Sequence, residues 1–477
     1  MSLPLAPVIE RINADLDDAV QRLFALLRVP SISTDSAYDN DVKRAAQMLV
    51  DDLAGIGFDA KLHETTGHPM VIARHAGPGS DDVPHVLYYG HYDVQPADPL
   101  EQWDSPPFEP VLVDGEHGKR ILARGAVDDK GQMMTFIEAF RAYQAVHGSL
   151  PIKVTVLLEG EEESGSPSLD PFLEANKEML AADVCVVCDT GMWDIDTPAV
   201  TYMLRGLMYV EATLRGPSHD LHSGMYGGAV VNPINELTRI LGQLHDERGV
   251  VQIPGFYDDV RELDEAEARQ WAQLGFDESA FLSSAGLKTP VGEVNRSTLE
   301  RTWSRPTCDI NGIFGGYTGK GAKTVIGAEA SAKVSCRLVP DQQPQKIYDG
   351  LKQFLDERTP PDCRWEVVSH GMSPAIRVPT DSPYLRAAMT GLAETYGKPA
   401  VLIGCGGSIP VVGSIQRILG FDSLLVGFGL DDDRLHSPNE KFELRCFEMG
   451  IKSHAAIMSQ LASVSRQRTA PTEAAVR

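Results

Sequence analysis

Histidine and acidic residues recur along the chain next to short apolar segments. They are His91 and Asp93 in GHYDVQP, Asp128 and Asp129 in RGAVDDKGQ, Glu161–Glu163 in LEGEEESGS, Asp189 after VCVVC, and His436 in DDDRLHSPNE. Imidazole nitrogens and carboxylate oxygens without thiolate are ligands that suit zinc, with manganese as the next choice. In open α/β sheets, ligands bind beyond the carboxyl ends of the strands, where such segments can converge. The pattern therefore predicts a metal site.

Each position alone also has a purely structural interpretation. A single histidine after a strand, such as His91, is more often a surface or hydrogen-bonded residue. An acidic run such as Glu161–Glu163 is usually a solvated face, and Asp128 and Asp129 could simply cap the helix that follows them. The joint occurrence at successive strand ends favours a site, because neither capping nor solubility requires it.

Local spacing suggests how the site could work. His91 and Asp93 are separated by one residue, so in an extended chain both point to the same side. A carboxylate behind a metal-bound imidazole fixes the tautomer of the ring and raises its basicity. Glu162 and Glu163 point in different directions, so one can bind metal while the other acts as the general base on a bound water.

The elements that would position these residues alternate between helices and strands. Helix-like spacing occurs at 8–28, 41–56, 130–147 and 168–180, and buried-strand runs occur at 86–89, 152–158 and 184–187. After about residue 378 the pattern resumes with helices at 382–396 and 440–461 and strands at 399–403 and 423–427. This alternation predicts an α/β domain with a mostly parallel sheet.

The middle of the chain has a different pattern. Strand character at 202–214 and 324–338 alternates with helices at 233–247 and 344–357, and residues 250–323 are predicted to be irregular. The block reads as a smaller α+β domain inserted into the first. The predicted division is a catalytic domain at 1–203 and 379–462, an inserted domain at 204–378 and a frayed tail at 463–477.

Composition excludes several function classes. The 477 residues include 43 basic and 67 acidic side chains, which give a formal net charge of −24. Such a surface repels phosphate backbones and anionic lipid, so neither nucleic acid nor a membrane is an expected partner. The seven cysteines show no disulfide spacing, and neither a signal peptide nor a membrane-spanning stretch is evident. A soluble cytoplasmic protein is expected.

The motifs together resemble a known family over residues 10–462. The chain is similar to the co-catalytic zinc metallopeptidases that include carnosinase-type dipeptidases, aminoacylase, glutamate carboxypeptidase, acetylornithine deacetylase and succinyl-diaminopimelate desuccinylase. GHYDVQP, GAVDDKG, LEGEEESGS, DLHSG and HSPNE occur in the family's order. KTVI, RLVP and GGSIP point to the carnosinase-like dipeptidase branch.

The resemblance implies a ligand set for two divalent metal ions. His91 would bind the first ion, His436 would bind the second, and Asp128 would bridge the two. Glu163 would complete the shell of one ion and Asp189 the shell of the other. The family's peptide bond after the bridging aspartate is often cis, which here is the bond between Asp128 and Asp129.

The resemblance also implies catalytic and substrate-binding roles. Glu162 would be the general base for a metal-bridging hydroxide, and Asp93 would orient His91. His222 in DLHSG would polarise the scissile carbonyl in the neighbouring subunit of a homodimer, with the inserted domain as lid and dimer interface. Substrate would be held by three further residues: Arg337 in RLVP, which pairs with the free carboxylate, Thr324 in KTVI and Ser408 in GGSIP.

The leading functional prediction is a two-metal amidohydrolase that cleaves dipeptides or similar small substrates with a free C-terminal carboxylate. An N-acyl amino acid deacylase would use the same site chemistry, and a non-catalytic binding protein could share the fold. One departure affects the substrate. Relatives often carry Arg-Glu before GGSIP, whereas this chain has Gly404 and Cys405, so substrate preference transfers less directly than the metal site.

Overall fold

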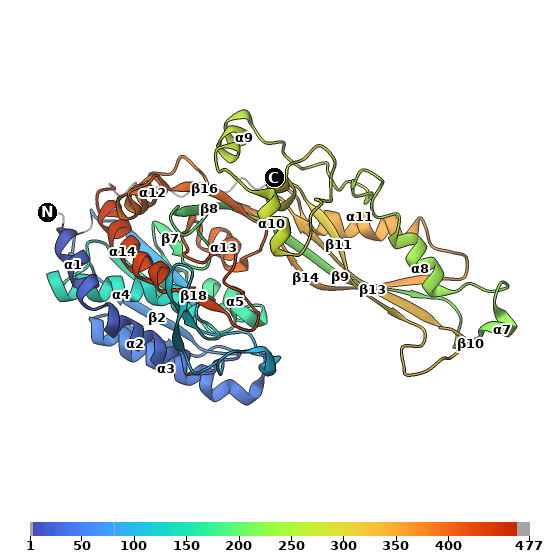
Figure 1. Cartoon of the computed structure of the whole chain (residues 1–477), viewed down its shortest axis with the longest axis horizontal. Helices are drawn as coiled ribbons and strands as arrows, with labels where there is room; N and C mark the ends of the chain where they lie inside the picture. Colours follow the sequence, from blue (N-terminus) through green and yellow to red (C-terminus); the bar gives the residue numbers. More distant parts are fainter. Residues whose placement is uncertain (1–2, 81, 465–477) are drawn as a thin grey trace. The chain divides into compact units, whose positions relative to one another are not determined.

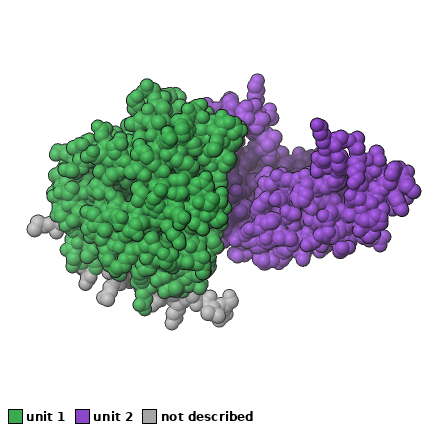
Figure 2. Space-filling view, turned by 90° about the horizontal axis from the view of Figure 1, so that it is seen from below, with its two compact units in different colours: residues 1–202, 378–403, 414–477 green, residues 203–377, 404–413 purple. Residues whose placement is uncertain are grey.

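The computed structural model describes residues 3–80 and 82–464 and divides the chain into two compact units. Unit 1 comprises Met1–Tyr202, Val378–Ile403 and Ser414–Arg477, and unit 2 comprises Met203–Arg377 and Gly404–Gly413 (Figure 2). Unit 1 has an α/β architecture and unit 2 an α+β architecture, which confirms the predicted fold class. Of the predicted tail, residues 465–477 lie outside the described part. Among the described residues, no helix has the length and apolar character needed to cross a membrane.

The larger sheet has nine strands in the order β1-β2-β6-β3-β7-β17-β8-β15, with β16 paired to β8 (Figure 1). In chain order these strands are β1 Asp59–His63, β2 Met70–His75, β3 His85–His91, β6 Lys153–Glu159, β7 Val184–Val187, β8 Ala199–Leu204, β15 Ile376–Arg377, β16 Val401–Cys405 and β17 Ser423–Leu425. The neighbours β6, β3, β7 and β17 run parallel, while β1, β2 and β15 pair antiparallel at the sides. The carboxyl ends of the four parallel strands therefore share one edge of the sheet. The histidine and acidic residues predicted as metal ligands lie at this edge.

Helices pack against this sheet in unit 1. The helices with residues in unit 1 are α1 Ala6–Ala14, α2 Leu16–Leu27, η1 Ser36–Tyr38, α3 Asp39–Ile56, η2 Leu100–Gln102, α4 Lys130–His147, η3 Glu162–Ser164, α5 Leu169–Ala175, α6 Lys177–Leu180, α12 Pro383–Tyr396, α13 Pro410–Ser414, η5 Ile415–Leu419 and α14 Leu444–Leu461. The strands β3 and β7 are apolar along nearly their whole length because both faces are covered. Tyr88 of β3 packs edge-on against Phe140 of α4 in this core.

Two predicted helices of unit 1 differ from the structure. The segment 8–28 is two helices rather than one, because the backbone of Asp15 leaves helical geometry between them. The segment 440–461 was predicted to be helical throughout, but its first residues form β18 (Lys441–Glu443). This strand pairs with β5 (Gly118–Leu122) in a three-stranded sheet that also contains β4 (Val111–Gly115), and such a pairing across the sequence has no local signal.

Unit 2 is built on an antiparallel sheet in the order β11-β13-β9-β14. The elements of this unit are β9 Gly206–Arg215, β10 Leu221–His222, α7 Ser223–Tyr226, α8 Pro233–Leu241, α9 Glu265–Ala272, α10 Glu278–Ser284, η4 Glu300–Ser304, β11 Thr307–Gly315, β12 Val325–Ile326, β13 Glu329–Leu338, α11 Pro344–Asp356 and β14 Arg364–Ser373. Every second residue of β9 is buried, and three of these residues, Met208, Val210 and Ala212, share a core with Leu237 of α8 and Leu351 of α11. The prediction that 250–323 is irregular is wrong, since helices and the strand β11 lie within it.

A fully buried histidine in the core of unit 1 gives this unit a specific pH response. His454 of α14 is enclosed by aromatic rings, and its Nε2 lies 3.3 Å from the Sγ of Cys188. Burial lowers the pKa of His454 to about 3. Because the folded pKa lies below the unfolded value, the folded protein resists protonation, and stability is lost as the pH falls below about 6.5.

We therefore expect His454→Leu to flatten the acid limb of the stability curve. Between pH 6.5 and 4.5 the parent should lose roughly 2–3 kcal/mol more unfolding free energy than the variant. Urea unfolding at both pH values measures this difference. His117→Leu, on the exposed turn between β4 and β5, is the matched control and should keep the slope of the parent. Equal slopes for the parent and His454→Leu would contradict the expectation.

Candidate metal centre

The carboxyl edge of the parallel strands carries the predicted metal ligands. His91 is the last residue of β3, and Asp189 follows β7 by two residues. Glu163 lies in the short helix η3, which follows β6. Asp128 precedes α4, and His436 lies in the loop after β17. The structure therefore brings all five residues to one edge of the sheet in unit 1.

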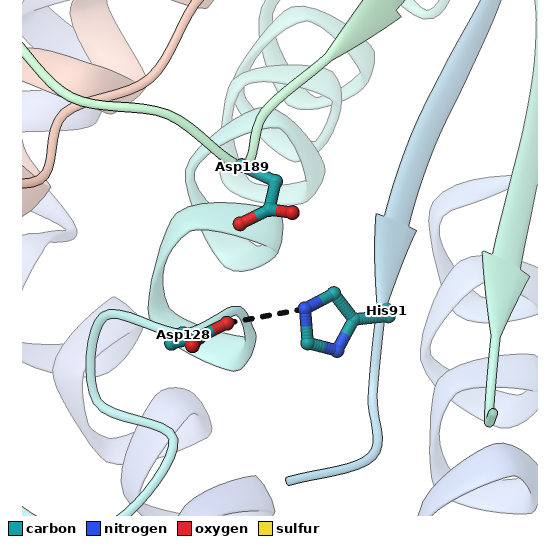
Figure 3. Close-up of side chains that lie close together, drawn as sticks. All are labelled: His91, Asp128 and Asp189. Atoms are coloured by element: carbon teal, nitrogen blue, oxygen red, sulfur yellow. Dashed lines mark ion pairs between the residues drawn. The ribbon is translucent and has the colours of Figure 1, made fainter. Parts of the chain in front are cut away.

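The first donor group consists of His91, Asp128 and Asp189, whose potential ligand atoms all lie within 4.8 Å of one another (Figure 3). The Nε2 of His91 lies 3.2 Å from the Oδ1 of Asp128. This nitrogen is buried and has no hydrogen-bond partner among the described residues. On the other side of the ring, Nδ1 lies 3.3 Å from the Oδ1 of Asp93. An orphaned imidazole nitrogen that faces two carboxylates fits a metal cation.

The second donor group consists of Asp128, Glu163 and His436. The Nε2 of His436 lies 2.9 Å from the Oδ2 of Asp128 and 3.4 Å from the Oε2 of Glu163. Asp128 thus presents one oxygen to each group. The peptide bond between Asp128 and Asp129 is cis. A carboxylate shared in this way is the arrangement by which two ions are held side by side.

The electrostatics of the two groups favour a cation. Burial and the neighbouring Asp128 raise the pKa of the Glu163 carboxyl to about 8. Burial also raises the pKa of Asp189 well above its usual value. The hydrogen bond to Asp128 raises the pKa of His436 to about 9. These pKa shifts arise because several carboxyl groups are buried close to one another and away from water. Divalent ions would supply the positive charge that balances the buried carboxylates.

Asp93 holds two parts of the site together. Besides facing His91, its carboxylate accepts hydrogen bonds from the backbone N–H of Glu162 at 3.3 Å and of Glu163 at 3.0 Å. The hydroxyl of Ser33 donates to it at 2.6 Å. The sequence indicated only the contact with His91. Gln95, which sequence reasoning missed, donates to the Oε2 of Glu163 at 2.8 Å, and its position in GHYDVQP is the only local signal.

The three consecutive glutamates have distinct surroundings. The buried carboxylate of Glu161 accepts hydrogen bonds from the backbone N–H of His68 at 2.8 Å and of Ser168 at 3.1 Å, so it stabilises neighbouring loops. Glu163 belongs to the second donor group. Glu162 lies between them, outside both groups, and burial raises its pKa. A carboxyl group beside a metal site can accept a proton and return it, and a raised pKa favours this task.

The predicted substrate residues lie in unit 2 in two separate places. Near the end of β13, Arg337 donates from Nη1 to the Oγ of Ser408 at 3.2 Å, and Ser408 donates to the backbone oxygen of Arg205 at 2.5 Å. Beyond the start of β13, His222 pairs with Val325, directly after Thr324. The length of β13 separates these places by about 26 Å. One unit 2 therefore does not bring His222 and Thr324 to Arg337 and Ser408.

The departure at Gly404 has a steric basis within unit 2. A Cβ atom at this position would lie 2.7 Å from the Cβ and Cγ of Trp303. Trp303 is itself packed edge-on against Trp271, with ring centroids 5.0 Å apart. No side chain fits at 404 unless Trp303 moves. An arginine at position 404 would therefore require Trp303 to move.

The fold and the site together define a class of protein. An α/β unit with two donor groups that share a carboxylate, and a buried glutamate beside them, is typical of hydrolases that use two metal ions. The model of peptidase family M20/M25/M40 matches residues 87–460. The chain belongs to this family, which confirms the resemblance predicted from its motifs.

Similar proteins include named peptidases. Cys-Gly metallodipeptidase DUG1 of Saccharomyces cerevisiae is 31% identical over 479 residues, which cover 96% of this chain and 98% of that protein. Beta-Ala-His dipeptidase of Homo sapiens is 30% identical over 403 residues, with 83% and 78% covered. The solved M20 family metallo-carboxypeptidase Sso-CP2 of Sulfolobus solfataricus has a TM-score of 0.82 at 31% identity, with 94% and 99% covered.

Proposed function

We propose that the protein is a two-metal dipeptidase that hydrolyses small peptides with a free C-terminal carboxylate. The observation that carries this proposal is the pair of donor groups that share Asp128, with Glu162 next to them. The dipeptidase names of the similar yeast and human proteins support the substrate class. Zinc is the proposed metal and manganese the alternative, because the donors are imidazole and carboxylate.

In this proposal each residue of the centre has one task. His91 and Asp189 hold one ion, Glu163 and His436 hold the other, and Asp128 serves both. When bound, the ions polarise the amide carbonyl and lower the pKa of a water molecule. The carboxylate of Glu162 accepts a proton from the attacking water and donates it to the nitrogen of the leaving amine. Asp93 keeps the His91 ring and the backbone of Glu162 and Glu163 in place.

A hydrolysis panel tests the function. Protein stripped of metal and reloaded with Zn²⁺ or Mn²⁺ is assayed on dipeptides, on acetyl- and succinyl-amino acids, and on blocked tripeptides. We expect the protein to hydrolyse dipeptides faster than the other substrates and to release free amino acids from them. Preferential release of acetate or succinate would identify an N-acyl amino acid deacylase instead. Binding of two ions without hydrolysis of any substrate would identify a non-catalytic protein on this fold.

Arg337 is proposed to bind the substrate carboxylate. Among the described residues, the Arg337 guanidinium donates a hydrogen bond only to the Ser408 hydroxyl. Its other N–H groups are therefore available to a ligand. We expect Arg337→Met to reduce kcat/KM on free dipeptides by at least about 100-fold, because a charge-assisted pair is lost. The same variant should lose far less on dipeptide C-terminal amides. Equal losses on both substrate types would show that Arg337 has a structural role.

We also propose a homodimer in which unit 2 serves as lid and dimer interface. The separation of His222 from Arg337 along β13 supports this proposal, since one unit 2 cannot present both to a small substrate. His222 is exposed, and its Nδ1 accepts a hydrogen bond from the nearby backbone N–H of Gly224 at 3.0 Å. Its Nε2 is then free to reach the scissile carbonyl in the partner subunit.

Mixed dimers test this arrangement. His222→Ala and Glu162→Gln homodimers should both be nearly inactive. A dimer with one copy of each contains one site with an intact Glu162 and a donated intact His222. Co-refolding the two variants should therefore restore a substantial fraction of the parental activity, with purified homodimers as controls. If verified mixed dimers stay as inactive as their parents, His222 does not act across the interface.

A cytoplasmic location is proposed as well. None of the seven cysteines forms a disulfide bond within the described residues, and five of them are buried. Cysteines outside disulfides are typical of proteins that work in a reducing compartment.

A further inference from the structure

An ion pair is buried behind the metal centre. The side chains of Arg124 and Glu440 are 1% and 0% exposed, and the Nη1 of Arg124 lies 2.7 Å from the Oε2 of Glu440. Neither residue belongs to the two donor groups. Enclosing two charges without water is costly, so the contacts that they make identify what the pair does.

Glu440 binds the backbone of the turn that leads to Asp128. Its Oε2 accepts the N–H of Gly125 at 2.9 Å, and its Oε1 accepts the N–H of Val127 at 2.9 Å and of Asp128 at 3.1 Å. With the guanidinium of Arg124, the two oxygens receive four hydrogen bonds. Glu440 follows His436 by four residues, so it connects the loop of one metal ligand with the turn of the shared ligand.

Arg124 connects the pair to a third segment. Its Nη2 donates to the backbone oxygen of Pro96 at 3.1 Å, and its guanidinium lies over the ring of Trp103 at 5.5 Å. Pro96 ends the GHYDVQP segment, which begins next to His91 and contains the Gln95 that binds Glu163. The ion pair therefore touches all three segments that carry His91, Asp128 and His436.

The loop of His436 requires such anchoring. Three of its non-glycine residues have positive φ, with Arg434 at 59°, His436 at 57° and Asn439 at 63°. This conformation costs free energy and persists only where the surroundings determine it. Asn439 accepts a hydrogen bond from the N–H of Asp104 at 2.7 Å, and Glu440 is fixed by the four bonds described above.

We propose that the Arg124–Glu440 pair is a positioning device that sets the spacing of His91, Asp128 and His436 and thereby the separation of the two metal ions. This inference rests on the metal centre of the proposed function. A carboxylate is required at 440 because both of its oxygens face N–H donors. Glutamine would turn an NH₂ group against two of those donors.

Glu440→Gln tests the proposal, and Glu443→Gln is the matched control. Glu443 is 2% exposed and lies three residues further on, but its Oε1 forms an ion pair with the Nζ of Lys441 at 3.1 Å rather than a contact with the Asp128 turn. Calorimetric titration of Mn²⁺ into metal-free protein is expected to show both ions bound about 10–100-fold more weakly in Glu440→Gln. In Glu443→Gln both affinities should stay within about threefold of the parent.

A second readout does not depend on metal or turnover. Hydrogen exchange of the peptide that contains residues 125–128 should be faster in metal-free Glu440→Gln than in the parent, and unchanged in Glu443→Gln. If Glu440→Gln does not fold, Arg124→Lys is the variant that tests the proposal. Lysine keeps the positive charge but lacks the planar guanidinium that reaches both Glu440 and Pro96. We expect this variant to bind both ions at least about fivefold more weakly than the parent.

The outcomes separate this inference from the proposed function. If the parent binds two Mn²⁺ ions and hydrolyses dipeptides while folded Glu440→Gln binds both ions within about threefold of the parent, the positioning role is overturned and the function stands. If Glu440→Gln does not fold, an Arg124→Lys variant that binds both ions as tightly as the parent likewise overturns the positioning role. A parent that fails to bind two ions would instead overturn the proposed centre itself.

Discussion

Glu162→Gln should retain both metal ions and lose at least about 10²–10⁴-fold in kcat. Glutamine has nearly the same shape as glutamate but cannot accept a proton from water. Glu162 lies outside both donor groups, so its replacement should leave the ligands in place. Burial raises the pKa of Glu162, which matches the task of taking up a proton and then releasing it. Metal analysis of the purified variant and steady-state kinetics on a dipeptide measure the two properties.

The adjacent residue provides the control for this experiment. Glu163→Gln removes a charge from the second donor group and should weaken binding of one ion, whereas Glu162→Gln should weaken neither. Two neighbouring substitutions of identical chemistry would then differ in metal content. Unchanged activity of Glu162→Gln at full metal content would falsify its role as the base.

Asp128→Ala should abolish binding of both ions and with it all measurable activity. The Oδ1 of Asp128 faces His91 and its Oδ2 faces His436, and among the described residues only Asp128 belongs to both groups. Asp189→Ala, by comparison, removes a ligand from the first group only. We expect titration with Mn²⁺ to find no tight site in Asp128→Ala and one remaining site in Asp189→Ala.

Asp93→Ala should reduce metal affinity less than either substitution of a ligand. Asp93 contacts the ligand His91 and the backbone of Glu162 and Glu163 rather than the metal position, so its loss should weaken metal affinity by roughly 10–100-fold. The ranking Asp128→Ala, Asp189→Ala, Asp93→Ala in decreasing severity is the expected pattern. Two ions bound normally by Asp128→Ala would rule out the shared role.

The five residues that the sequence marked as candidate ligands lie together in the structure, while their roles stay predictions. His91, Asp189 and the glutamates follow strands that run parallel, and parallel strands place their carboxyl ends at a common edge. The assembly therefore follows from local patterns plus one rule of topology. The partition into two groups, with Asp189 beside His91 and Glu163 beside His436, needed the structure, because the spacing along the chain does not determine it.

Other features could not be predicted because their causes lie far away in the sequence. Glu440 binds the backbone of residues that precede it by more than 300 positions, and no local pattern marks such a contact. The strand β18 (Lys441–Glu443) exists because β5 offers it a partner. In unit 2, the strand β11 (Thr307–Gly315) contains exposed polar residues and glycine, so it lacks the alternation that predicts a strand.

The contact between Trp303 and Gly404 constrains the order in which substitutions at these two positions can be tolerated. An arginine introduced at 404 would collide with the indole, so a variant with that single substitution is penalised before any benefit appears. A smaller residue at 303 must come first, although by itself it leaves Trp271 without its packing partner. Replacement of Gly404 by arginine together with a smaller residue at 303 therefore passes through an unfavourable single substitution in either order. Such sign epistasis favours retention of Gly404.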